Sequence, residues 1–258
     1  MSAVMALLTM RFGLILVRVS TCITAMPLFG NLPNLRIKAA LIALLSFVLT
    51  SASPGDDPIP AEPLAFVVAA FGEAVIGLSI GVCARLVLVA GELAGQAIGV
   101  PMGIGFMQVV DPMSGDQLVV TSRFYLAMTI MVFLVLGGHH VVIQGLATSL
   151  RTWPPGAGIP SGDLGLVAAN LAGAVLHAGV SLAAPVLISL LAVKVGLGLI
   201  ARSAPKVQVF FIGFAVAIIV GLVVLIVTAP ELVGQLAELT MSMGDWIASL
   251  LEAAGGLA

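Results

Sequence analysis

The chain has 258 residues, of which 60% are apolar and only 9% carry a charged side chain. A soluble domain typically has about 45–50% apolar and about 25% charged residues, so this composition excludes a soluble enzyme. The net charge of −2 excludes a general electrostatic attraction to nucleic acid. Because a membrane-spanning helix needs roughly 20 apolar residues, the chain has room for about six or seven spans and little else.

Long runs without charge, separated by turn residues, predict an all-α, polytopic membrane protein with about six long apolar segments. The segments are residues 12–29, 39–53, 64–90, 124–150, 164–193 and 207–229. Residues 54–63 contain four prolines, which predicts a loop because a helix interior does not tolerate them. Pro185 lies inside the fifth segment, which is long enough for a tilted or kinked helix.

Charges in the connections predict a topology under the positive-inside rule. Basic connections are expected in the cytoplasm and acidic ones on the opposite side. The bases are Arg36, Lys38, Arg85, Arg123, Arg202 and Lys206, and the acids are Asp56, Asp57, Glu62, Asp163 and the tail from Glu231. Arg151 is the exception. This topology places both termini outside the cytoplasm, on the assumption that every apolar run spans the bilayer. Residues 1–18 lack the small-residue site of a cleaved signal peptide, so the N-terminus is expected to be retained.

Glycine recurs at every fourth residue in the third segment and directly after it. The positions are Gly77 and Gly81, followed by Gly91, Gly95 and Gly99. Glycines at this spacing form a smooth stripe on one helical face and allow another backbone to approach closely. Two interpretations stay open, a seam between subunits of an oligomer and a contact within the chain. No Lys-Ser or Lys-Thr pair follows the glycines, so they do not form a phosphate loop.

Pro101 is expected to break this helix, and residues 104–117 are neither cleanly apolar nor freely soluble. One interpretation is a re-entrant or pore-lining loop, because non-helical backbone at membrane depth needs protein or a water-filled cavity around it. The other is an ordinary aqueous loop with a turn at 111–115. In the first case bulky Phe106 and flexible Met107 are the gate side chains. The residues assigned to this loop are Gly103, Gly105, Phe106, Met107, Asp111, Pro112 and Gly115.

Three ionisable residues interrupt the apolar segments, Arg18, Glu73 and Arg85. Charges inside the membrane are costly and therefore functional candidates. Glu73 and Arg85 are separated by about 18 Å along a helix, so they cannot pair with each other. Arg18 is the expected partner of Glu73. The sequence leaves open whether these charges fix packing and assembly or relay a proton or substrate.

Other reactive residues lack a recognisable pattern. Cys22 and Cys83 lie in apolar runs and are expected to be buried small side chains. Adjacent His139 and His140 point about 100° apart on a helix, and His177 stands alone. No nucleophile, base and acid occur at catalytic spacing. We therefore expect no catalytic residues, no metal site and no cofactor.

Four blocks of sequence, taken in order from about Arg18 to Leu225, resemble one known family. They are Arg18 with 25–30, Pro33 and 36–41; 73–77 with Gly81, Arg85, 94–99, Phe106 and 111–115; 133–140 with Ser149 and 154–156; and 184–185 with 197–205, 209–214 and 221–222. Together they resemble the FliR proteins of the bacterial flagellar type III export gate and their injectisome counterparts. The chain departs from the family pattern at Pro101, Lys206, Gln208 and Ala215, which affects expectations about local loop geometry.

The resemblance implies a non-enzymatic subunit of the flagellar basal body in the bacterial inner membrane. It implies one copy in a helical assembly with several FliP and FliQ chains, with many apolar segments buried against partners rather than lipid. Residues 1–160 correspond to a FliP-like part, and residues 161–258 to a FliQ-like helical hairpin and tail. The glycine-rich loop at about 101–117 corresponds to the plug that closes the channel for unfolded polypeptides.

Three alternatives remain from the sequence. A small secondary transporter or channel would have paired, symmetry-related broken helices, and here only the stretch near Pro101 fits, with Pro185 an imperfect match. An intramembrane enzyme lacks its nucleophile and base. The equivalent injectisome subunit would share the same fold and partners.

Overall fold

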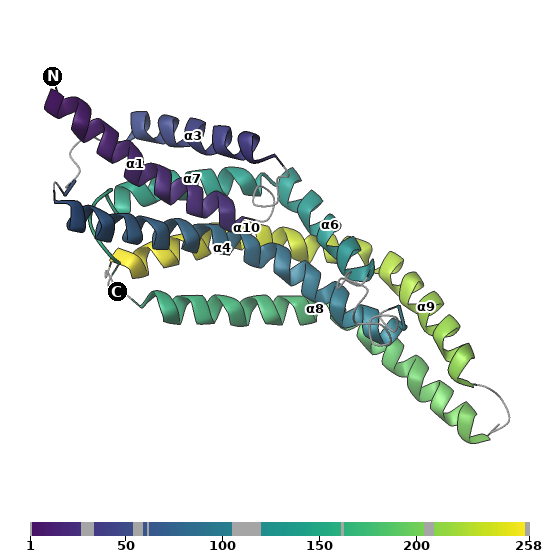
Figure 1. The fold of residues 1–258 in the computed structure, drawn as a ribbon. Helices are drawn as coiled ribbons and strands as arrows, with labels where there is room; N and C mark the ends of the chain where they lie inside the picture. The colour runs from purple at the N-terminus through teal and green to yellow at the C-terminus, as the bar shows by residue number, and fades with distance from the viewer. Residues whose placement is uncertain are drawn as a thin grey trace. The chain divides into compact units, whose positions relative to one another are not determined.

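The structure is a computed structural model that describes residues 2–26, 34–53, 59–60, 62–104, 120–160, 163–203 and 209–255. Within these residues the regular secondary structure is helical, which confirms the predicted all-α class. The helices are α1 (Ser2–Ala25), α3 (Leu35–Ala52), α4 (Pro63–Met102), α6 (Val120–Val135), α7 (Gly138–Thr152), α8 (Leu164–Ser203), α9 (Val209–Val227) and α10 (Ala229–Gly255) (Figure 1).

By length and composition, four of the described helices can cross a membrane. These are Leu7–Ala25 in α1, Leu35–Ala52, Pro63–Met102, and Gly165–Ser203 in α8. The number rises to six if the broken pairs α6–α7 and α9–α10 each count as one span. This range agrees with the expected six apolar segments. The direction in which each helix crosses stays a prediction.

The sequence predicts one segment over residues 124–150, but the structure has two helices there. α6 ends at Val135, and α7 begins at Gly138. Between them Gly137 has a φ of 73°, in the left-handed region. Glycine adopts this conformation at little cost, and a single left-handed residue ends a right-handed helix. The glycine pair therefore interrupts a run that hydropathy alone reads as continuous.

Other helices differ from the expected segments mainly in their ends. α3 begins at Leu35 rather than near 39, because the Asn34 side chain caps it by accepting a hydrogen bond from Arg36 N–H at 3.1 Å. α4 continues through the glycine-rich stretch and ends one residue after Pro101. α8 runs for 40 residues with Pro185 inside it.

Residues 231–255, expected as part of an acidic tail, belong to α10, a helix of 27 residues that begins at Ala229. Its acidic side chains are exposed and recur at every seventh position: Glu231, Glu238, Asp245 and Glu252. Its buried positions follow the alternating spacing of three and four residues that marks an apolar helix face: Leu236, Thr240, Met243, Ile247, Leu250 and Ala254. α10 is therefore amphipathic, with its acids opposite the packed face.

The chain forms two compact units. Unit 1 comprises Met1–Leu86, Gly137–Ala172 and Met241–Ala258, and unit 2 comprises Val87–Leu136 and Gly173–Thr240. Helices α4, α8 and α10 each contribute residues to both units. Each unit contains residues from both sides of position 160. The likeness of residues 1–160 to FliP and of residues 161–258 to FliQ stays a prediction.

Unit 1 is built around α1 and α4, with α7 and the end of α10 packed on the same core. α3 contacts α1 and leaves apolar side chains such as Leu44 and Phe47 exposed. The core side chains are fully or almost fully buried: Leu14, Ile15, Val19, Ile76, Ile80, Val142, Leu146, Met243 and Ile247.

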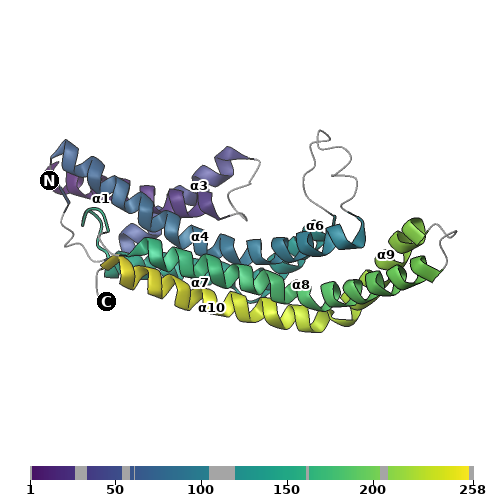
Figure 2. The same ribbon diagram turned by 90° about the horizontal axis from the view of Figure 1, so that it is seen from below.

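Unit 2 has its core between the end of α4, α6, and the hairpin of α8 and α9, which run side by side in both views (Figures 1 and 2). The first turns of α10 complete this core. Its buried members are Ala94, Ile98, Met102, Tyr125, Leu182, Ala183, Val186, Leu190, Ala217, Leu225, Leu232 and Leu236.

Candidate functional site

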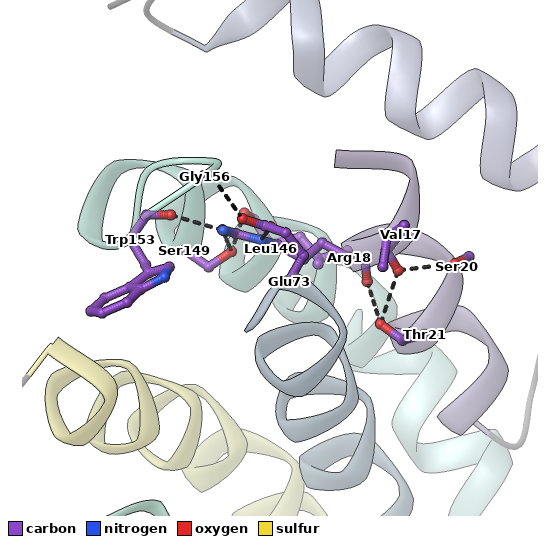
Figure 3. A network of polar contacts seen from close by, with 9 residues as sticks. All are labelled: Val17, Arg18, Ser20, Thr21, Glu73, Leu146, Ser149, Trp153 and Gly156. Atoms are coloured by element: carbon purple, nitrogen blue, oxygen red, sulfur yellow. Dashed lines mark hydrogen bonds and ion pairs between the residues drawn. The ribbon is translucent and has the colours of Figure 1, made fainter. Parts of the chain in front are cut away.

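A buried ion pair joins the first and third described helices. Arg18 on α1 donates from Nε to Glu73 Oε2 on α4 at 2.5 Å, and both side chains are only 1% exposed (Figure 3). This contact confirms the pairing that the sequence predicted. Because both charges are removed from water, the pair is stable only if its remaining polar atoms find partners.

Those partners come from α7 and the segment after it. Arg18 Nη1 donates to Ser149 Oγ at 3.0 Å, and Nη2 donates to the Trp153 carbonyl oxygen at 2.9 Å. The second carboxylate oxygen of Glu73 accepts from Gly156 N–H at 3.2 Å. We call Arg18, Glu73, Ser149, Trp153 and Gly156 the ion-pair network (Figure 3). Its charge-assisted hydrogen bonds link α1 and α4 to α7 and to residues 153–156, which follow α7.

A tight turn places the Gly156 N–H. Ala157 N–H donates to the Pro154 carbonyl at 3.2 Å, and Gly156 has a φ of 92°. Proline at the second position and a glycine with positive φ at the third are the signature of a type II turn. The turn lies directly on α4, because a Cβ atom at Gly72 would be 2.0 Å from the Gly158 carbonyl oxygen. The Pro-Pro-Gly sequence therefore brings a main-chain donor to the buried carboxylate.

The geometry favours a structural ion pair over a proton or substrate relay. Both side chains are closed off from solvent, and besides each other they contact main-chain groups and the hydroxyl of Ser149. Ser149 Oγ itself donates to the Leu146 carbonyl at 2.8 Å, so its proton is also committed. Such an arrangement fixes the positions of helices in an apolar core.

Arg85 does not share this environment. It lies on α4 but is exposed in the single chain, so its expected role as a buried charge stays a prediction about the assembly. Twelve residues separate it from Glu73 along one helix, and its side chain points to a different face. It is therefore available to a molecule outside the chain.

The glycine stripes mark close contacts between helices inside each unit. In unit 1 a Cβ atom at Gly77 would lie 2.1 Å from the Arg18 carbonyl oxygen, and one at Gly81 would lie 2.5 Å from that of Cys22. These contacts bring α1 against α4 beside the ion-pair network. Of the two interpretations, the structure therefore shows a contact within the chain at Gly77 and Gly81.

In unit 2 the stripe continues along α4 and receives α6. A Cβ atom at Gly91 would lie 2.0 Å from Thr129 Oγ1, and one at Gly95 would lie 2.5 Å from the Cα atom of Ser122. Thr121 Oγ1 also donates to the Gly95 carbonyl at 2.7 Å. Gly99 is buried on the same helix. The contact within the chain again accounts for Gly91 and Gly95.

Most of the predicted plug loop lies outside the described residues. This applies to Gly105, Phe106, Met107, Asp111, Pro112 and Gly115. Gly103 is described and has a φ of 83°, and a Cβ atom there would lie 2.2 Å from the Phe214 ring. Glycine is required at this position, both for its backbone conformation and for the aromatic ring that fills the space.

The remaining reactive residues are the cysteines and histidines of the apolar helices. Cys22 and Cys83 are buried free thiols, as predicted. The rings of His139 and His140 lie 4.1 Å apart between centroids. Across the described ranges, no group of three or more His, Cys, Asp or Glu side chains could hold a metal ion.

Sequence reasoning missed three members of the ion-pair network, Ser149, Trp153 and Gly156. The Pro-Pro-Gly sequence was a usable signal, because it predicts a turn of defined type. A main-chain carbonyl such as that of Trp153 gives no residue-type signal at all. Its role follows only from the fold.

Comparison with known proteins agrees with the resemblance drawn from the four blocks. The family model described as "Bacterial export proteins, family 1" matches residues 9–243. The chain is 30% identical to the flagellar biosynthetic protein FliR of Bacillus subtilis (strain 168), over 84% of this chain and 85% of the relative. It is 29% identical to FliR of Pectobacterium carotovorum subsp. carotovorum, over 91% and 90%. It is 29% identical to FliR of Escherichia coli (strain K12), over 83% and 82%.

Proposed function

We propose that this chain, which belongs to family 1 of the bacterial export proteins, is a non-enzymatic subunit of the flagellar protein export gate in the bacterial inner membrane. There it assembles with FliP-like and FliQ-like subunits around a channel for unfolded flagellar proteins. The family match over residues 9–243 carries the proposal. The flagellar names of the reported relatives favour the flagellar system over an injectisome.

The surface of the described helices supports a role in an assembly. Large apolar side chains are exposed on several helices, among them Phe47 on α3, Ile188 on α8 and Ile226 on α9. Apolar surface of this extent is unfavourable in water and needs lipid or a protein partner. In the proposed gate, residues 1–160 take a FliP-like place and residues 161–258 a FliQ-like place, so that this chain closes the ring of subunits.

In this proposal some of the charges and the glycines stabilise packing within the chain, and one charge contacts a partner subunit. Arg18 and Glu73 hold α1, α4 and α7 together, and the glycine stripes set the spacing of the helices around them. Arg85 is exposed on α4 and contacts a partner subunit. A cation in an apolar environment has a strong preference for an anionic partner, which gives Arg85 a defined role in assembly.

Residues 101–117 form the plug in the proposed gate. Phe106 and Met107 provide bulk and adaptable packing that seal the channel against ions. Gly103, Gly105 and Gly115 allow the segment to fold aside when a polypeptide enters. Asp111 and Pro112 anchor the loop through a turn, in which the carboxylate accepts main-chain hydrogen bonds.

Co-purification tests the assembly. The tagged chain is expected to retain FliP-like and FliQ-like subunits after mild detergent extraction, and Arg85→Glu is expected to lose them. Arg151→Glu is the matched control, because Arg151 is an exposed arginine on α7. A chain that purifies alone and transports a solute in liposomes would instead identify a secondary transporter.

Ion conductance tests the plug. Phe106→Ala combined with Met107→Ala is expected to leave the complex intact, to raise the conductance of membranes that contain it and to slow growth. Phe124→Ala serves as control, because Phe124 is an exposed aromatic on α6 beyond the loop. Unchanged conductance with normal assembly would show that residues 104–117 are an ordinary aqueous loop.

A further inference from the structure

An open groove lies along the α8–α9 hairpin in unit 2, where the end of α4 meets it. Its volume is about 440 Å³, within the roughly 300–1,000 Å³ typical of ligand pockets. One charged residue, Lys194, lies among apolar and small ones. The lining residues are Val100, Pro101, Lys194, Leu197, Gly198, Ala201, Gly213, Phe214 and Ala217. We call this feature the hairpin groove.

Contacts inside unit 2 hold the walls of the hairpin groove. The Phe214 ring sits on Gly103, where a Cβ atom would be only 2.2 Å from it, and Leu197 Cδ1 lies 3.3 Å from the Cβ position of Gly213. Ala217 forms part of the buried core. By contrast, apart from its chain neighbours and the backbone of its own helix, no atom of the described residues lies within 4 Å of the Cβ position of Gly198. The groove therefore has a packed floor and an open side at Gly198.

The hairpin carries basic residues but no acidic ones. Residues 164–230 contain Lys194, Arg202 and Lys206 but no aspartate or glutamate. Lys194 and Arg202 are exposed on α8, and Lys194 makes no ion pair within the part of the chain that the structure describes. Lys194 lies inside the candidate span Gly165–Ser203, about 13 Å from its end at 1.5 Å per residue.

A lysine in this position needs an anionic partner, and the described residues form no ion pair with it. An unpaired cation within a membrane segment is costly, whereas a basic pocket between membrane helices is a recognised site for acidic lipid head groups. The rest of the hairpin groove is apolar, which matches an acyl chain. One cation at the rim of an apolar groove is complementary to an amphiphile with one anionic head.

We propose that the hairpin groove binds an anionic glycerophospholipid of the bilayer. Its phosphate accepts hydrogen bonds from the Lys194 ammonium group, and one acyl chain lies along Leu197, Gly198 and Phe214. Arg202, two turns further along α8, contacts the head group of the same lipid or of its neighbour. This site belongs to the hairpin itself and does not require the partner subunits of the export gate.

Lipid binding can be measured on the full chain, with any co-purified subunits, by native mass spectrometry in mild detergent. Phosphatidylglycerol and phosphatidylcholine with identical acyl chains are the two probes. The parent is expected to bind phosphatidylglycerol about tenfold more tightly, which corresponds to about 1.4 kcal/mol. Lys194→Gln is expected to abolish that preference, and Lys194→Arg to retain it. Arg151→Gln removes one positive charge outside the groove and is expected to change nothing.

A second pair of variants tests the groove rather than the charge. Gly198→Leu fills the open side of the groove and is expected to weaken the binding of both lipids. Gly173→Leu is its control, because Gly173 lies on the same helix, also faces open space and is outside the groove. Equal binding of the two lipids by the parent would overturn the proposal, as would an unchanged preference in Lys194→Gln. So would a cross-link from Lys194 to a carboxylate of a partner subunit that excludes phosphatidylglycerol.

Discussion

Replacing Arg18 with alanine should be among the most damaging single substitutions in unit 1. The guanidinium group donates to three acceptors, Glu73, Ser149 and the Trp153 carbonyl. After Arg18→Ala, the Glu73 carboxylate loses its cation and keeps the hydrogen bond from Gly156 N–H. A charge would then remain in a site that is 1% exposed.

The magnitude follows from what is left behind. Removing one member of a buried ion pair typically destabilises a protein by about 3–5 kcal/mol, because the other charge stays uncompensated. Ser149→Ala removes one acceptor and leaves the pair intact, so its cost should be about 1–3 kcal/mol. Replacing both charges by methionine fills similar volume without charge and should recover most of the loss.

The assay is a double-mutant cycle on Arg18→Met and Glu73→Met. The free energy of unfolding of the purified chain is measured by denaturant titration in detergent micelles. We expect a coupling of at least about 3 kcal/mol, because the double variant should be destabilised less than either single variant. Arg85→Ala is the control, because this arginine lies on the same helix as Glu73 but is exposed. Additive effects of the two substitutions would refute the reasoning. So would equal destabilisation by Arg85→Ala and Arg18→Ala.

Three further substitutions test other parts of the fold by the same stability measurement. Gly95→Leu should separate α4 from α6, because a Cβ atom there would lie 2.5 Å from the Ser122 Cα atom. We expect it to cost about 1–3 kcal/mol. Gly173→Leu is the control and should not destabilise the chain, because Gly173 faces open space among the described residues. Tyr125→Phe should stabilise the chain by about 1 kcal/mol, since the buried hydroxyl has no hydrogen-bond partner among the described residues. A lower free energy of unfolding would contradict this. Gly156→Ala should cost about 1–2 kcal/mol because φ is 92° there, whereas a neutral result would mean that the turn relaxes.

The pairing of Arg18 with Glu73 could be predicted because apolar segments contain so few ionisable residues that the choice of partners is small. The same reasoning named no partner for Arg85, which is exposed on α4. Composition shows that a charge lies within an apolar run but not which face of the helix carries it. Only the packing of α4 places Glu73 inward and Arg85 outward.

Glycine spacing predicted close helix contacts but not the helices that make them. The surface of α6 that meets Gly91 and Gly95 consists of Thr129, Thr121 and Ser122, which have no special signal in the sequence. The break at Gly137 was hidden because hydropathy does not report a backbone angle. The acidic residues from Glu231 onward suggest a tail, whereas the apolar positions of α10 have the spacing of a helix face.

The composition of unit 1 has a consequence for biogenesis. Its buried residues include Leu14 on α1 and Ile247 on α10, and Ile247 lies against Gly145 on α7. The N-terminal residues of this core therefore keep an exposed apolar surface until residue 247 has been synthesised. Contacts between positions so far apart in sequence also form slowly. During that interval membrane chaperones and proteases can act on the nascent chain. A truncation near residue 240 would consequently harm the part of the protein that is translated first.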